Sequence, residues 1–219
     1  MTAATTDLRM LNLAKLQKAA KHEEPFEYLL VDDVLQESSK QAIIEDFPKI
    51  DRIGSFPLNT LKYGPGFSEL IEELLGKEFE RAVGERFGLD LSQYPTMFTV
   101  RGQCSATSDG HIHTDSRDKI ITVLLYLNQD WNDPSGGRLR LLKSKNLEDY
   151  VAEVPPTMGS LLVFKRSDRS WHGHKPFEGK RMSLQMNWVK SDRYQRKEQF
   201  RHGISSFFKK LFGRSTYEG

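Results

Sequence analysis

The 219-residue chain lacks several features that mark whole classes of protein. It has a single cysteine, Cys104, so an internal disulfide is impossible and the composition suits a reducing compartment. No apolar run approaches the roughly 18 residues that a membrane-spanning helix needs, and the first residues show no apolar segment of a secretion signal. The formal net charge of +2 gives no general attraction to nucleic acid. We therefore expect a cytoplasmic protein without a nucleic-acid partner.

Helical patterns dominate the first 93 residues. Apolar spacing and end signals predict helices within 35–47 and 65–89, the second of them broken near Gly76, and a helix-compatible stretch with leucines at 8, 11, 13 and 16. The segment 25–35 reads as a short strand. We expect residues 1–93 to form a helical support region that packs on the rest of the chain.

Short runs rich in β-branched and aromatic residues begin near Tyr94. Breaks rich in Gly, Pro, Asp, Asn and Ser separate them, which is typical of antiparallel strands. Eight strands are expected, at 96–102, 110–114, 119–127, 137–142, 150–154, 159–164, 170–175 and 181–189. This spacing predicts a mainly β fold, a closed or sandwich-like core over 94–190 with flanking helices, within one structural domain.

The last segment, 191–219, is expected to be a basic amphipathic helix. An apolar stripe recurs at helical spacing, and eight Lys/Arg stand against two Asp/Glu between Lys190 and Arg214. Two interpretations stay open. The stripe packs on the protein itself or on a second subunit, which we favour because an exposed stripe promotes aggregation. Otherwise it lies on an anionic membrane surface.

Histidines two residues apart occur twice in the β region. His111, His113 and Asp115 alternate, so in an extended chain their side chains would point to the same face. His172 and His174 repeat the spacing. Two imidazoles and one carboxylate are the ligand set of non-haem Fe(II) oxygenases. A lone His-x-Asp is weak evidence, since it also occurs in solvated turns, and the spacing leaves open which histidines bind metal.

Two longer stretches are more specific. The runs "HTDSRDKIITVLLYLNQDWNDPSGGRLRLL" and "GSLLVFKRSDRSWHGHKPFEGKRMSLQMNW" resemble the Fe(II)- and 2-oxoglutarate-dependent dioxygenases, in particular their prolyl 4-hydroxylase-like branch. The resemblance covers about residues 96–190. It implies a double-stranded β-helix, also called a jelly roll or cupin-like barrel. It further implies a hydroxylase that releases succinate and CO2.

The resemblance also assigns roles to residues. The family aspartate follows its histidine by two residues, which selects His113 and Asp115. The family's basic residue follows the distal histidine by nine or ten residues, and Arg181 lies nine after His172 but seven after His174. The implied Fe(II) ligands are therefore His113, Asp115 and His172. Arg181 and Tyr126 are expected to bind the far carboxylate of 2-oxoglutarate, for which a guanidinium is well shaped.

Other assignments are less specific. His111, His174 and Gln103 are candidates for residues that contact the metal ligands or line the pocket, and ascorbate is a candidate cofactor. We favour a small-molecule or tailoring-pathway substrate, with a protein residue as the other option. The alternative functions are a non-catalytic metal- or ligand-binding jelly roll and a zinc hydrolase. No His-Glu-x-x-His motif supports the hydrolase.

Overall fold

The computed structural model describes residues 8–131 and 136–191. Two antiparallel sheets face each other. The larger has the order β1-β2-β8-β5-β10-β4-β3 and the smaller has the order β7-β6-β9. The strands are β1 (Lys21–His22), β2 (Tyr28–Val31), β3 (Phe56–Pro57), β4 (Thr96–Cys104), β5 (Lys119–Tyr126), β6 (Leu139–Leu142), β7 (Tyr150–Val154), β8 (Leu161–Lys165), β9 (His172–His174) and β10 (Gly179–Val189).

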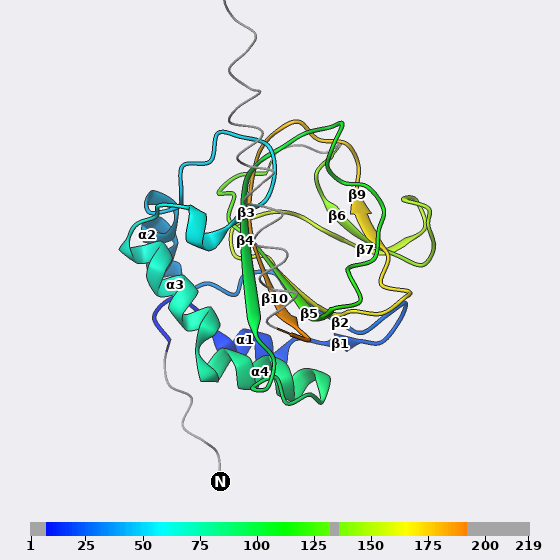
Figure 1. Ribbon diagram of the computed structural model, residues 1–219, viewed down its shortest axis with the longest axis horizontal. Helices are drawn as coiled ribbons and strands as arrows, with labels where there is room; N and C mark the ends of the chain where they lie inside the picture. Colours follow the sequence, from blue (N-terminus) through cyan, green and yellow to red (C-terminus); the bar gives the residue numbers. More distant parts are fainter. Residues whose placement is uncertain (1–7, 132–135, 192–219) are drawn as a thin grey trace, which may run out of the picture.

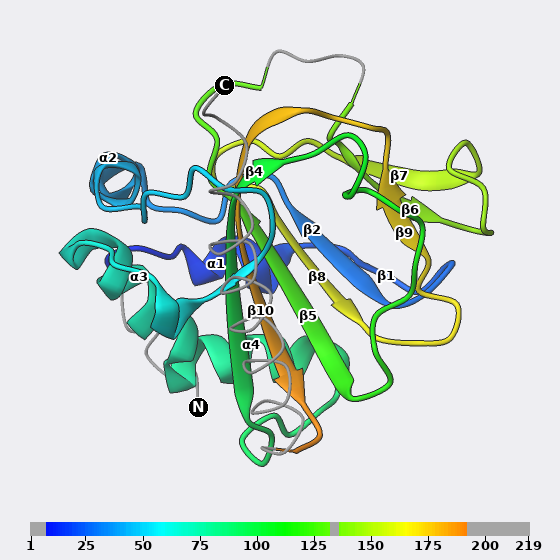
Figure 2. The ribbon, with the colours of Figure 1, turned by 45° about the horizontal axis from the view of Figure 1, so that its top comes forward.

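Helices cover the outer face of the large sheet, and the small sheet lies on its inner side (Figures 1 and 2). The α helices are α1 (Leu13–Lys18), α2 (Lys40–Glu45), α3 (Pro65–Leu75) and α4 (Lys77–Phe87), with 3-10 turns η1 (Glu37–Ser39) and η2 (Leu58–Thr60). This is the expected double-stranded β-helix with flanking helices. In the part of the chain that the structure describes, no helix is long and apolar enough to span a membrane.

The helix predictions are confirmed where glycines mark the ends of helices. Gly76 separates α3 from α4, as its position predicted, and Gly88 ends α4 in the left-handed conformation with φ of +64°. The leucine-rich start is helical only over α1. Before it, Leu11 makes an isolated bridge with Leu35, and the Asn12 side chain caps the helix. Tertiary pairing outweighs helix propensity there.

Seven of the eight strands expected in the β region are present. The eighth, at 110–114, is wrong, because only His113 makes a β-bridge and the residues around it have no strand pairing. Gly110 has φ of +83°, a turn conformation that interrupts an extended strand. We expected His111 to share a face with His113 and Asp115 because of strand alternation. No strand runs through these residues, so the structure does not support that expectation.

The N-terminal region does more than support the barrel. β2 pairs with β8 along the large sheet, and β3 pairs with β4, so residues before 94 complete that sheet. The helical support expected of residues 1–93 is therefore only part of what this region contributes. The predicted C-terminal helix lies outside the described residues, apart from Ser191.

The large sheet has a different core on each face. Outward side chains such as Val123, Val163 and Leu184 pack with the helices in the main hydrophobic core. Inward side chains form a second cluster between the sheets, consisting of Phe26, Tyr28, Tyr126, Leu139, Leu141, Val154, Leu162 and Phe164. On β10 the inward positions are polar instead, occupied by Arg181, Ser183, Gln185 and Asn187, as strand alternation and the pairing with β5 place them.

A half-buried carboxylate ties the N-terminal segment to the helices. Both oxygens of Glu73 on α3 accept hydrogen bonds from backbone N–H groups of Arg9, Met10 and Leu11 at 2.7–3.1 Å. Charge-assisted bonds of this kind are among the stronger ones in proteins. Glu73 thus holds the segment that leads into α1.

We expect Glu73→Ala to lower the free energy of unfolding by about 1–3 kcal/mol, since three backbone donors lose their acceptor. Glu72→Ala is the matched control, because Glu72 is exposed and bonds only Ser68 on its own helix. Urea unfolding of both variants measures the effect. Equal stabilities would contradict the role given to Glu73.

Candidate metal centre and cosubstrate site

Among the described residues, one group of three potential ligands lies close enough to hold a metal ion. It consists of His113, Asp115 and His172, with one ligand atom of each within 4.8 Å of the others. His113 is exposed, whereas Asp115 and His172 are buried. The group therefore has one ligand residue at the surface and two inside the protein.

Backbone pairing brings the two histidines together. His113 and His172 form an antiparallel bridge, in which each N–H donates to the carbonyl of the other at 3.0 Å. Directly paired residues present their side chains on the same face, and the two ring centroids are 4.3 Å apart. Residues distant in sequence thus become neighbouring ligands through main-chain hydrogen bonds.

Gly173 permits this close approach. A Cβ at this position would lie 2.8 Å from the carbonyl oxygen of Gly110 and 3.2 Å from Cα of Ile112. The backbone of 110–113 therefore passes against β9 at a distance that only glycine allows.

Both imidazoles are oriented by their own chain. Nδ1 of His113 lies 2.8 Å from the carbonyl of His111, and Nδ1 of His172 lies 2.9 Å from the carbonyl of Ser170. A carbonyl only accepts, so each Nδ1 carries a proton, and Nε2 is the ring nitrogen that remains available to a metal. Backbone partners of this kind are typical of metal-binding histidines.

Two side chains hold the Asp115 carboxylate. Lys119 donates to Oδ1 at 2.7 Å and Thr122 to Oδ2 at 2.5 Å, while Nε of Arg166 donates to the Asp115 backbone carbonyl at 3.1 Å. Burial by itself raises the pKa of Asp115, but the Lys119 ammonium and the neighbouring groups outweigh it and lower the pKa to about 2. The carboxylate is ionised at neutral pH.

The donor set suits a divalent metal. Burial lowers the pKa of His172 to about 4, so its imidazole is neutral at pH 7. Two imidazoles and one carboxylate anion match the facial ligand set of non-haem Fe(II) sites, which leaves the other coordination positions open.

Arg181 and Tyr126 meet inside the barrel, on neighbouring strands β10 and β5. The Arg181 guanidinium, 5% exposed, donates from Nε to the carbonyl of Gly137 at 2.8 Å and from Nη2 to the Tyr126 hydroxyl at 3.3 Å. No carboxylate of the described residues lies within ion-pair distance of it. A buried guanidinium without an anionic partner is costly, so this position fits the far carboxylate of 2-oxoglutarate.

The remaining candidates lie at different places. His174 is buried, its Nδ1 donates to the carbonyl of Lys175, and its Nε2 lies 3.9 Å from Sγ of Cys104. His111 is exposed and supports the site through its carbonyl rather than its ring. Gln103 lies on β4 opposite Lys180 of β10. None of the three belongs to the ligand group, and their pocket roles stay predictions.

Burial also decides the state of the single cysteine. It raises the pKa of Cys104 to about 11, so the residue is a neutral thiol at pH 7. A nucleophilic role is therefore unsupported.

Sequence reasoning missed the residues that hold Asp115. The residues that contact Asp115 come from two places, with Lys119 and Thr122 on β5 and Arg166 directly after β8. Thr122 carried one usable signal, since it alternates with Tyr126 along β5 and therefore points to the same inner face.

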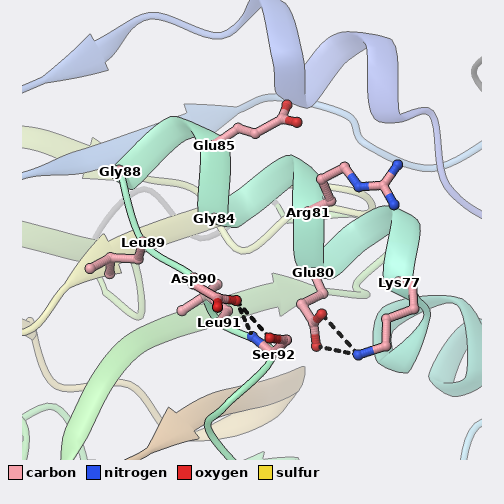
Figure 3. A pocket seen from close by; sticks show the side chains of 10 residues that line it. All are labelled: Lys77, Glu80, Arg81, Gly84, Glu85, Gly88, Leu89, Asp90, Leu91 and Ser92. Carbon is pink, nitrogen blue, oxygen red and sulfur yellow. Dashed lines mark hydrogen bonds and ion pairs between the residues drawn. The ribbon is translucent and has the colours of Figure 1, made fainter. Parts of the chain in front are cut away.

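A separate hollow of about 540 Å3 lies beside α4 and the turn that follows it (Figure 3). Its charged side chains are partly paired, as in the contacts between Lys77 and Glu80 and between Asp90 and Ser92. No residue of the ligand group lines it. The hollow lies on the helical side of the molecule, so we do not connect it with the metal chemistry.

Comparison with known proteins agrees with this class of site. The family model of the 2OG-Fe(II) oxygenase superfamily matches residues 101–190, the segment that contains the ligand group, Tyr126 and Arg181. This segment belongs to that superfamily, and the protein is a dioxygenase that uses Fe(II) and 2-oxoglutarate. No curated protein matches the chain by sequence.

Solved structures with the same fold include two prolyl 4-hydroxylases. One from Phytophthora capsici is 18% identical, with a TM-score of 0.57 over 87% of this chain and 69% of that one. One from Pseudomonas putida is 19% identical, with a TM-score of 0.53 over 81% of this chain and 90% of that one. The expected resemblance to this branch is confirmed at the level of the fold.

The tight contact at Gly173 gives a first site prediction. We expect Gly173→Ala to push the 110–113 segment away from β9 and weaken Fe(II) binding at least tenfold, because two ligands lose their shared backbone pairing. Gly88→Ala is the control, since no atom lies within 4 Å of the added Cβ and only its left-handed φ is strained. Isothermal titration with a divalent metal compares the two. Unchanged affinity in Gly173→Ala would refute the steric argument.

The cosubstrate site gives a graded prediction. Arg181→Lys keeps a charge but loses the planar fork, so KM for 2-oxoglutarate should rise strongly while Fe(II) binding persists. Tyr126→Phe should raise KM less, since it removes one hydrogen bond worth about 0.5–1.5 kcal/mol. Succinate formation at varied 2-oxoglutarate measures both. A wild-type KM in Arg181→Ala would exclude Arg181 from this role.

Proposed function

We propose that the protein hydroxylates an unactivated C–H bond of its substrate. One oxygen atom of O2 enters the C–H bond as a hydroxyl, and the other enters succinate as 2-oxoglutarate loses CO2. The observation that carries the proposal is the convergence of one ligand atom each of His113, Asp115 and His172 within 4.8 Å. Bound iron would supply the activation of dioxygen, and the three residues would hold it.

The chain's other residues support that chemistry by binding and orientation. We propose that Arg181 and Tyr126 fix 2-oxoglutarate by its far carboxylate, deeper between the sheets than the ligand group. Asp115 also favours hydroxylation over halogenation, because the related halogenases have a small residue at this position. Hydroxylation therefore stays the leading hypothesis, ahead of the two alternatives, a non-catalytic jelly roll and a zinc hydrolase.

The substrate is a separate proposal. Our sequence-based preference for a small molecule or a biosynthetic product stays a prediction. The fold shared with two prolyl 4-hydroxylases supports prolyl peptides as the second class to test. A panel of both classes, assayed by substrate-dependent succinate release and by a mass increase of one oxygen, distinguishes them. Cytoplasmic location and a contribution of ascorbate are likewise predictions.

The ligand assignment has a direct test. Alanine variants of His113, Asp115 and His172 should each lose bound iron and succinate formation, because a three-ligand site has no redundancy. Iron content after anaerobic loading and desalting gives the first readout, and succinate yield gives the second.

Two further variants serve as matched controls. His111→Ala and His174→Ala remove imidazoles two residues from a proposed ligand and should retain iron and measurable turnover. A His174→Ala variant without iron, together with a His172→Ala variant that retains it, would show that the distal ligand is misassigned.

A further inference from the structure

A chain of uncharged side chains leads from the interior of β10 to the Asp115 carboxylate. Gln185 donates from Nε2 to Oδ1 of Asn187 at 2.9 Å, and Asn187 donates from Nδ2 to Oγ1 of Thr122 at 2.8 Å. Thr122 in turn donates to Oδ2 of Asp115 at 2.5 Å. Three side chains from two strands therefore end on one proposed metal ligand.

The sheet register places these groups in contact. Asn187 on β10 is paired directly with Thr122 on β5, so both side chains point to the inner face at the same level. Gln185 precedes Asn187 by two residues and shares that face. The exposed fractions of Asn187 and Thr122 are 0% and 1%, so water does not substitute for the missing partner if one group is removed.

The hydrogen bonds have a defined direction. A threonine hydroxyl has one proton and can point it at several acceptors. The Asn187 amide donates its hydrogen bond to the Thr122 oxygen, so Thr122 does not donate to Asn187. The Thr122 hydroxyl proton is therefore available to Asp115. Gln185, as a donor to Oδ1 of Asn187, fixes which way that amide faces. The array therefore turns Thr122 into a dedicated donor to the carboxylate.

This arrangement bears on metal binding. Each carboxylate oxygen of Asp115 has one donor, Lys119 on Oδ1 and Thr122 on Oδ2, and each oxygen keeps lone-pair capacity for a metal. Two fixed donors restrict rotation of the carboxylate about its side-chain bonds. A ligand held in its binding orientation loses less freedom when the metal arrives.

We propose that Asn187 and Gln185 are positioning residues for the metal centre, which act through Thr122 to hold Asp115 in its metal-binding orientation. The proposal rests on the assignment of Asp115 as a ligand. Removal of supporting partners around metal ligands typically lowers metal affinity about 10–100-fold. We expect an effect in that range for loss of the Asn187 donor and a smaller one for Gln185, which acts one step further away.

The test is titration of the metal-free full chain with Co(II) alone, followed by visible absorption and calorimetry. Asn187→Leu keeps the volume but removes both hydrogen bonds, and Thr122→Val removes the donor to Asp115. Both should weaken Co(II) binding at least tenfold. Thr122→Ser restores the hydroxyl and should bind within about threefold of the wild type.

Ser183→Ala is the matched control, since Ser183 is a buried polar residue on the same face of β10 but outside the array. It should bind Co(II) as the wild type does. Thermal melting of the metal-free proteins separates positioning from a structural role. A structural role would lower the melting temperature of Asn187→Leu and leave its Co(II) affinity within threefold of the wild type, which overturns the proposal.

A second variant covers the case in which Asn187→Leu does not fold. Gln185 is only half-buried, and Gln185→Leu should fold and weaken Co(II) binding by threefold or more. Wild-type affinity in that variant overturns the proposal as well. If the unmodified protein binds no Co(II), the ligand assignment itself is contradicted. If the unmodified protein and the variants bind Co(II) equally well, only the positioning role is contradicted.

Discussion

The antiparallel backbone pair between His113 and His172 is the interaction on which the site depends. Its two hydrogen bonds join a segment with no strand of its own to the edge of the small sheet. Because the pairing is made by the main chain, it fixes the separation of the two imidazoles before any metal binds. Gly173 makes the approach possible, and the carbonyls of His111 and Ser170 then set the direction of each ring.

The rest of the barrel completes the site from the opposite sheet. β5 and β10 carry apolar side chains outward to the helices. Their inward side chains are mostly polar, with Leu124 of β5 as an apolar exception. Thr122 and Tyr126 on β5 lie two residues either side of Leu124, so the same inner face supports Asp115 at one level and Arg181 at another. The helices stabilise the sheet from outside and leave the inner face free for polar chemistry.

Sequence reasoning reached the parts that local pattern encodes. Short runs rich in β-branched and aromatic residues located β5, β8 and β10, and the glycine at 76 located the break between α3 and α4. Resemblance selected His113, Asp115, His172, Arg181 and Tyr126. It failed where pairing partners decide the structure. The 110–114 segment has the composition of a strand but makes only a bridge. The strand expected within 25–35 is present as β2, but its pairing with β8 could not be predicted from its residues. Of the partners of Asp115, only Thr122 carried a signal in the sequence, through its alternation with Tyr126, whereas the contact of Arg166 depends on the tertiary fold.

We propose that His113, Asp115 and His172 hold iron on one face and leave adjacent positions free for 2-oxoglutarate. Anaerobic addition of 2-oxoglutarate to the Fe(II)-loaded protein tests it most directly, because bidentate chelation of the iron produces a weak visible charge-transfer band. We predict that this band appears in the wild-type protein and is lost in Asp115→Ala. A protein that binds both Fe(II) and 2-oxoglutarate without forming the band would contradict the account.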